Sequence, residues 1–266
     1  DDGDGIGDAD DVFAADPTDG TGPDAAPPIE LTFQPDSDPV SILGVGFTGL
    51  MNNGQDWLDI YDPENVTVGS GALHYQVVMG TYPNADPSNL RNGFQFGINT
   101  PDQPFAINTT VSGLPENPAD VQIVGMQIGT GSQDEFMKFV IGSAEPKVEF
   151  SHEYPDSGFT TDPNEDPVQG LTGSDDPKTN LSLVVYPNQG THGVVEAYYK
   201  TEGGDWTFYK SKDIPSADWL DESDGQGLAV GIDAEAALDA PSFNATWHQF
   251  TVEELPSEPV SSSSSS

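Results

Sequence analysis

The amino-acid sequence predicts an all-β protein in which two antiparallel sheets pack as a jelly-roll sandwich. Apolar segments of strand length recur between residues 29 and 255 at a spacing of roughly ten residues, and clusters of Gly, Pro, Asn and Asp separate them. Several segments also alternate apolar with polar residues, as Phe94, Phe96 and Ile98 show. Long stretches with helical periodicity have little support, so both observations favour a β-sandwich.

The predicted strands fill most of the region between residues 29 and 255. Some have one apolar face, whereas residues 121–128 are apolar on both faces, as expected of a central strand. Short helical turns are expected only at 215–222 and 233–239. The predicted strands are 29–34, 41–47, 72–79, 93–99, 104–112, 121–128, 135–141, 146–152, 180–187, 193–200, 205–210, 227–232 and 243–252.

Composition divides the chain into three regions. Residues 1–28 are rich in Asp, Gly and Pro, and we expect an irregular calcium-binding segment there. Residues 29–255 read as one sandwich domain, since no internal repeat or linker interrupts them. Residues 256–266, PSEPVSSSSSS, have the composition of a flexible Pro/Ser linker. This arrangement predicts a module joined covalently to neighbouring domains.

The charge balance excludes some partners. The chain has 7 Lys and Arg against 45 Asp and Glu, and its formal net charge is −38. Such a chain repels phosphate backbones and anionic membrane surfaces, so we expect neither nucleic-acid binding nor membrane insertion. The charge suits a protein that binds divalent cations or works in high salt, and marine and halophilic origins fit it equally. We expect a monomer.

Cysteine and histidine usage excludes several kinds of site. The chain has no cysteine, which excludes disulfides, cysteine–zinc sites and a cysteine nucleophile. Its four histidines lack the spacing of a zinc site. No phosphate-binding loop or serine-nucleophile elbow occurs either.

The first eleven residues, DDGDGIGDADD, have the pattern of a calcium-binding loop. Calcium needs about 6–8 oxygen ligands, and alternating Asp and Gly supply them within a tight turn. The predicted ligands are Asp2, Asp4, the backbone carbonyl of Ile6, Asp8 and Asp11. The first ligand of the usual pattern would precede Asp1, so we expect weaker binding at that position. The alternative is an acidic segment without a metal.

This opening resembles the thrombospondin type 3 repeat. After the Asp/Gly loop, Asp11-Val12-Phe13 and Asp16-Pro17 continue the pattern of that repeat over about 20 residues. The resemblance implies a calcium-filled spacer between modules of a secreted or cell-surface protein. A second calcium could lie in the acidic loop 155–178, or that loop could be merely solvated. Its candidate ligands are Asp156, Asp162, Asn164, Glu165 and Asp166.

The region 29–255 resembles the concanavalin A-like, or laminin G-like, sandwiches of bacterial exoproteins. The stretches that carry the resemblance include GLMNNGQDWLDIYDP (49–63), NLRNGFQFGI (89–98), QIVGMQIGTGSQDEFMKFVIG (122–142) and FNATWHQFTVEE (243–254). The resemblance implies that one concave sheet or its rim holds a glycan. The polyserine tail resembles linkers of secreted polysaccharide-degrading enzymes of marine bacteria.

A glycan site needs an aromatic plane for the sugar ring and planar polar groups for its hydroxyls. Trp57 could be such a plane or could close the end of the sandwich, while Trp206 and Trp247 lie in strand patterns and are expected in the core. Arg91 and Lys138 could contact a ligand or pair with carboxylates. The predicted ligand-binding residues are Trp57, Tyr61, Arg91, Gln95, Gln127, Lys138, His152 and Glu153, with Tyr154 beside them.

Concanavalin A-like folds include glycosidases, so a pair of catalytic carboxylates was sought. A retaining glycosidase needs two carboxylates about 5–5.5 Å apart. No E-x-D-x-x-E arrangement occurs, and Glu149 and Glu153 are the nearest pair on one predicted strand face. We therefore expect a non-catalytic carbohydrate-binding module that targets a polysaccharide or cell-surface glycan. The alternatives are a structural or adhesive module without a small ligand, and a glycoside hydrolase or polysaccharide lyase.

Overall fold

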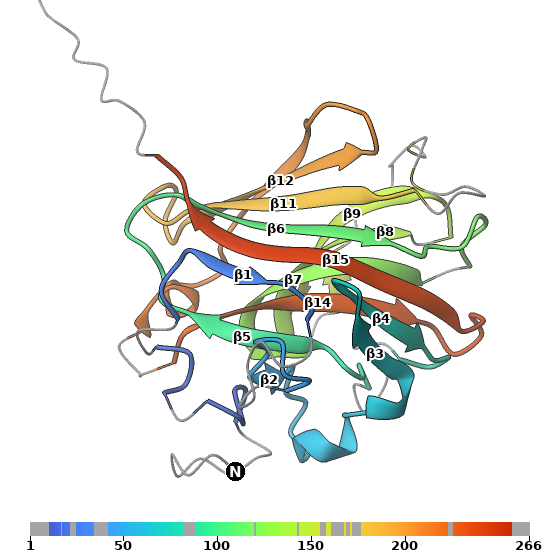
Figure 1. Ribbon diagram of the computed structural model, residues 1–266. Coiled ribbons are helices and arrows are strands. Elements are labelled where there is room, and N and C mark those ends of the chain that lie inside the picture. Colours follow the sequence, from blue (N-terminus) through green and yellow to red (C-terminus); the bar gives the residue numbers. More distant parts are fainter. Residues whose placement is uncertain are drawn as a thin grey trace, which may run out of the picture.

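The fold is a sandwich of two antiparallel sheets, as the sequence predicts (Figure 1). In this computed structural model the residues described are 11–16, 18–21, 25–34, 42–81, 89–119, 121–142, 144–154, 158–160, 168, 171, 177–222 and 226–256. Within these ranges there is no α-helix, and three short 3-10 helices occur: η2 (Trp57–Asp59), η3 (Pro63–Asn65) and η4 (Ala217–Trp219). The expected helical turn near residues 215–222 is therefore confirmed.

One sheet has eight strands in the described part of the chain and lies in front in Figure 1. Its order is β13 (Thr207–Asp213), β12 (Val194–Thr201), β11 (Thr179–Tyr186), β6 (Phe105–Ser112), β15 (Phe243–Glu254), β4 (Ala72–Val77) and β3 (Val66–Gly69). The short strand β1 (Ile29–Leu31) also pairs with β15, at Phe250 to Val252 and beyond the end of β4.

The other sheet has seven strands among the described residues and lies behind the first (Figure 1). Its order is β10 (Gly158–Thr160), β9 (Lys147–Tyr154), β8 (Glu135–Gly142), β7 (Gln122–Ser132), β14 (Leu228–Ala236), β5 (Phe94–Ile98) and β2 (Gly49–Leu50). All pairings between these strands are antiparallel.

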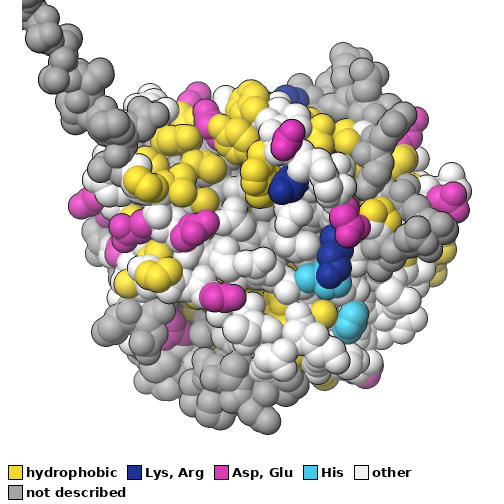
Figure 2. Space-filling view, turned by 45° about the horizontal axis from the view of Figure 1, so that its top comes forward, with side chains coloured by type: hydrophobic (Ala, Val, Ile, Leu, Met, Phe, Trp, Pro, Cys, Tyr) yellow, Lys and Arg dark blue, Asp and Glu magenta, His cyan; other side chains and the backbone are white. Residues whose placement is uncertain are grey.

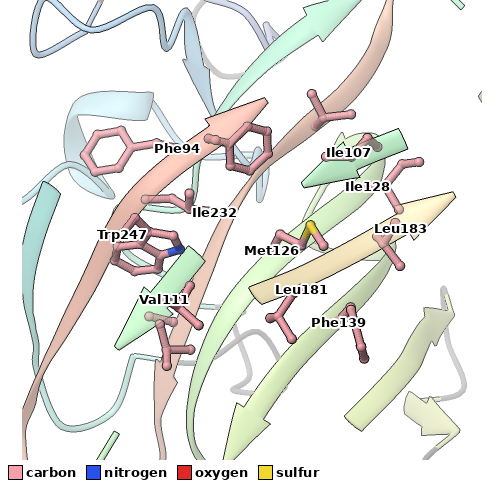
Figure 3. Close-up of a cluster of buried hydrophobic side chains, with 14 of the residues drawn as sticks. Phe94, Ile107, Val111, Met126, Ile128, Phe139, Leu181, Leu183, Ile232 and Trp247 are labelled. Carbon is pink, nitrogen blue, oxygen red and sulfur yellow. The ribbon is translucent and has the colours of Figure 1, made fainter. Parts of the chain in front are cut away.

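The hydrophobic core lies between the two sheets (Figure 3). Alternate residues of the facing strands point into it, such as Met126 and Ile128 from β7 and Leu181 and Leu183 from β11. Trp247 is fully buried there, and its indole nitrogen donates a hydrogen bond to the carbonyl of Gly125 at 2.8 Å. The expectation that Trp247 belongs to the core is confirmed.

Two sequence expectations about local structure are wrong. The predicted strand 41–47 is a folded-back turn over its described part, because Leu43, Gly44 and Gly46 have positive φ, and Ile42 donates its N–H to the carbonyl of Phe47 at 2.7 Å. The predicted helical turn 233–239 begins instead as the end of β14. Strand pairing with β7 continues to Ala236, and it outweighs the helix propensity of Ala and Glu.

The described part of the N-terminal region packs against the seven-stranded sheet. Phe13 is fully buried, and the N–H of Gly227 donates to the carbonyl of Asp19 at 2.7 Å. Gly20 has φ +74° and meets Gly97 of β5 so closely that a Cβ on either glycine would clash with the other. Residues 11–16 and 18–21 therefore lie on the outer side of β5 and contribute to the folded unit. Among the described residues, no helix has the length and apolarity to cross a membrane.

Candidate functional site

The outer face of the eight-stranded sheet carries an open groove with a volume of about 850 Å³. Strands β1, β6, β11, β12 and β15 all contribute side chains to its lining, together with the loop before β13. Figure 2 shows this side of the molecule, where hydrophobic side chains lie beside polar surface and scattered acidic groups. The lining includes Tyr198, Trp206, Asn108, Asn180, Ser182, Thr251, Glu30 and Glu253.

The strand register aligns these side chains into rows. One row crosses the sheet through directly paired positions on β13, β12, β11, β6, β15 and β1, and we call it the groove row. Its members are Phe208, Tyr198, Ser182, Asn108, Thr251 and Glu30. Residues on either side of Asn108 in β6, such as Ile107, point into the core, so the groove row lies on the opposite face.

The amide side chains of the groove are held by neighbours on the same face. Asn108 donates from Nδ2 to Oε1 of Glu253 at 3.1 Å, and its Oδ1 is the atom that can accept from a ligand. Asn180 accepts from the hydroxyl of Thr110 at 2.9 Å, and its Nδ2 is the group that can donate to a ligand. The groove thus presents fixed acceptors and donors, which lowers the entropy lost on binding.

Aromatic side chains lie at the β12–β13 end of the groove row: Tyr198 and Phe208 belong to the row, and Trp206 lies beside it. Trp206 is 50% exposed and Phe208 is 53% exposed. Tyr198 packs edge-on against Phe208 with ring centroids 5.5 Å apart, and its hydroxyl donates to Glu196 at 2.6 Å. Burial and this carboxylate raise the pKa of Tyr198, which stays a neutral donor. Rigid aromatic surface beside ordered amides is the combination that sugar recognition requires.

The expectation that Trp206 belongs to the core is wrong. It precedes β13, the edge strand of the sheet, and follows the turn at 202–204. A position at a sheet edge has strand-like neighbours in the sequence without a second sheet to cover it, so the apolar pattern did not reveal its exposure.

The seven-stranded sheet carries a second polar face, on the side away from the core. Lys138 of β8 and Glu235 of β14 form an ion pair of 2.6 Å, with the side chains 3% and 0% exposed. Asp233 lies two residues before Glu235 on the same strand face, and Glu149 and Glu153 extend from β9 on the same side. All five side chains are buried. We call these five residues the buried charge cluster.

Burial shapes the ionisation of this cluster. Burial acts to lower the pKa of Lys138, but Glu235, Asp233 and Glu149 outweigh it and raise that pKa, so Lys138 is charged. Burial raises the pKa of Asp233 well above its usual value, and the neighbouring charge of Glu235 adds to this. Burial also raises the pKa of Glu153, to about 7. The cluster therefore limits its net charge by holding protons on some carboxyl groups.

The structure brings four of the predicted ligand-binding residues to this second face. Gln95, Gln127, Lys138 and Glu153 all point away from the core, yet all are buried. Gln127 donates to Oε1 of Gln95 at 3.1 Å, and Gln95 donates to the carbonyl of Val12 at 2.9 Å.

The remaining predicted ligand-binding residues lie elsewhere. His152 points into the sandwich and packs edge-on against Trp219, with centroids 5.7 Å apart, and burial lowers its pKa to about 4. Trp57 and Tyr61 pack against the core beside η2, which matches the end-closing alternative for Trp57. Arg91 forms an ion pair of 2.9 Å with Asp62. The side chain of Tyr154 lies outside the described residues.

Most of the predicted calcium ligands cannot be placed. Asp2, Asp4, Ile6 and Asp8 lie outside the described residues, as do Asp156, Asp162, Asn164, Glu165 and Asp166. Asp11 is buried, and its Oδ1 accepts a hydrogen bond from the N–H of Phe13 at 2.8 Å. In the described part of the chain, no group of three or more acidic or histidine side chains is arranged to hold a metal.

Sequence reasoning missed two features. One is the groove row, whose members belong to six strands far apart in the sequence and share only an outward position. The other is the pair Asp233 and Glu235, which lies at the i, i+2 spacing that puts two carboxylates on one strand face. The segment GIDAE shows this spacing, but the strand was expected to end at residue 232.

Comparison with known proteins supports the fold. No family model matches the sequence, and no curated protein matches it. The GH43 protein BlXynB from Bacillus licheniformis superposes with a TM-score of 0.55 at 14% identity, over 73% of this chain and 35% of that chain. A xylan beta-1,4-xylosidase from Bacillus halodurans C-125 gives 0.51 at 12% identity, again over 73% of this chain and 35% of that chain.

A looser likeness is to arcelin-5, a lectin-like defence protein from Phaseolus vulgaris. Its TM-score is 0.45 at 11% identity, over 71% of this chain and 89% of that chain. The chain spans about a third of the two Bacillus chains above, 35% in each case. At such low identity these likenesses show the β-sandwich fold alone.

Proposed function

We propose that this chain is a carbohydrate-binding module of a secreted or cell-surface protein, and that its glycan lies in the groove of the eight-stranded sheet. The observation that carries the proposal is an open groove that combines two aromatic rings, the exposed Trp206 and the partly exposed Tyr198, with ordered amide and hydroxyl groups. Sugars offer apolar ring faces and many hydroxyls, and these two kinds of side chain match them. Trp206 and Tyr198 would stack on the sugar, and Asn108 and Asn180 would bond its hydroxyls.

The proposal is of a module and not of an enzyme activity. Two structures that share the fold are carbohydrate-active enzymes by name, but this chain spans 35% of each. Glu30 and Glu253 both line the groove, but both side chains are exposed, whereas a general acid is usually shielded from water. Residues 1–11 would bind calcium and link the module to a preceding domain. The residues that line the groove all lie outside this segment.

Binding to a panel of polysaccharides, measured by affinity electrophoresis and calorimetry with calcium present, tests the proposal. Trp206→Ala should weaken binding about fivefold or more, since an aromatic anchor in a binding site contributes over about 1 kcal/mol. Trp57→Ala is the matched control, because Trp57 is the aromatic platform that the sequence alone suggested, and it is the first residue of η2 and does not line the groove. Melting temperatures of both variants check that each remains folded.

The outcomes separate the alternatives. Absence of binding to every polysaccharide would refute the proposal and favour a structural or adhesive module. Loss of binding in Trp57→Ala but not in Trp206→Ala would move the site away from the groove. Release of reducing ends, abolished by Glu253→Gln, would replace the binding module with a hydrolase.

A further inference from the structure

The groove row is long. It crosses six neighbouring strands, from Phe208 on β13 to Glu30 on β1. Neighbouring strands lie about 4.8 Å apart, so five steps span roughly 24 Å. A single sugar ring would occupy only part of this length. The geometry therefore fits a chain of several sugars that lies across the strands.

The charge in the groove is negative. Among the described residues that line it are two carboxylates, Glu30 and Glu253, and no lysine or arginine. Glu196 adds a third carboxylate, bonded to Tyr198. Lys200 is paired with Asn180 across β11 and β12, one row beyond Tyr198, and it is the nearest basic residue by register. The formal net charge of the whole chain, which includes these carboxylates, is −38. An anionic glycan would meet repulsion along most of the groove.

The polar groups of the groove suit hydroxyls. Asn108 offers an acceptor and Asn180 a donor, as their other amide atoms are already bonded. Ser182 adds a hydroxyl, and the hydroxyl of Thr251, which accepts from Nδ2 of Asn108 at 3.4 Å, can still donate. A site for carboxylates or sulfates would need donors in excess, and arginine above all. The balance of donors and acceptors points to uncharged sugar hydroxyls.

We infer that the groove takes an uncharged polysaccharide and rejects uronic-acid and sulfated chains. This inference rests on the proposed function. It adds the class of polysaccharide and the direction in which the sugar chain crosses the strands. One end of the sugar chain lies on Trp206 and Phe208, and the other lies beside Glu30 and Glu253. The amides of Asn108 and Asn180 contact the hydroxyls between these ends.

Calorimetry with neutral oligosaccharides of increasing length, and with alginate and polygalacturonate, tests this inference at about 0.15 M salt with calcium. For xylo-, cello- and manno-oligosaccharides we expect the affinity of the best series to rise at least about tenfold from disaccharide to hexasaccharide. Alginate and polygalacturonate should not bind. The Glu30→Gln/Glu253→Gln double variant removes both groove carboxylates and should gain measurable binding to polygalacturonate.

A double variant elsewhere controls for net charge. Glu64 and Glu145 are exposed and lie outside the groove lining, so Glu64→Gln/Glu145→Gln changes the net charge equally and should leave anionic chains unbound. Wild-type binding to polygalacturonate or alginate as tight as to any neutral chain would overturn the inference. So would an affinity that stays flat from disaccharide to hexasaccharide. If Trp206→Ala then abolished that binding, the proposed function would survive, whereas binding to no sugar at all would refute the function itself.

Discussion

Replacing Glu153 by Gln should stabilise the protein above neutral pH and reduce the pH dependence of its stability. Glu153 is 6% exposed on β9, in the buried charge cluster. Burial raises its pKa from 4.5 to about 7; Lys138 opposes this, while Glu235 and Asp134 add to it. Gln has the shape of the protonated carboxyl group and carries no charge to bury.

The size of the effect follows from linkage. Because the folded protein holds this proton more tightly than the unfolded chain, the stability from Glu153 is complete at low pH. It is lost as the pH rises from the unfolded value of 4.5 through the folded value of about 7. Between pH 5 and pH 8 these two values give a loss of about 2.5 kcal/mol, which the variant should not show. For a chain of this size that corresponds to roughly 5–10 °C in melting temperature.

Urea unfolding of the wild type and the variant at several pH values from 5 to 8 measures this difference. The two unfolding free energies should differ most at pH 8 and converge toward pH 5. Glu145→Gln removes one exposed carboxylate and controls for the change in net charge. Parallel curves for wild type and Glu153→Gln, with a constant offset, would refute the assignment of a raised pKa to Glu153.

Three further predictions concern the stability of the fold. Lys138→Met removes the cation from Glu235 and Asp233, so urea unfolding at pH 7 should show a loss of about 3–5 kcal/mol, and a loss below about 1 kcal/mol would contradict the buried ion pair. Phe13→Ala empties a fully buried site under the N-terminal segment and should cost about 3–5 kcal/mol in the same assay, whereas a neutral result would mean that this segment is not anchored. Chelation of calcium should lower the melting temperature, because residues 1–11 are predicted to bind calcium, and added calcium should restore it. A melting temperature that changes neither on chelation nor on adding calcium back would contradict that site.

The sequence predicted the sandwich well because β periodicity is local. In the strands β5, β6, β7 and β8, alternation and turn residues mark the elements to within a few residues. The sequence-based prediction failed where positive φ angles turn the chain, as after Ile42. The residues of that turn have the composition of a strand. It also ended β14 at residue 232, because the apolar pattern stops there, although pairing with β7 carries the strand on to Ala236.

The candidate site was harder to predict because it depends on contacts between distant parts of the chain. Trp206 and Trp247 have similar neighbours in the sequence, yet one is 50% exposed and the other fully buried. Trp206 precedes the edge strand β13 and lines the outer groove, whereas Trp247 lies in the central strand β15 and faces the core. Register decides this, and no local pattern encodes it.

The two polar faces show how coverage decides function. Alternation places polar side chains on the outer face of both sheets, and it does so equally for Asn108 and for Lys138. On the seven-stranded sheet residues 11–16 and 18–21 pack over β5. The side chains of the buried charge cluster are themselves buried, and their charges are balanced by an ion pair and by protons held on carboxyl groups. On the eight-stranded sheet the groove is open to solvent. The amides of Asn108 and Asn180 are held by hydrogen bonds on one atom each, and the other amide atom can bond a ligand. A ligand that approaches from solvent reaches the outer face of the eight-stranded sheet but not the buried charges of the seven-stranded sheet. Mutations in the groove should therefore change binding without changing stability.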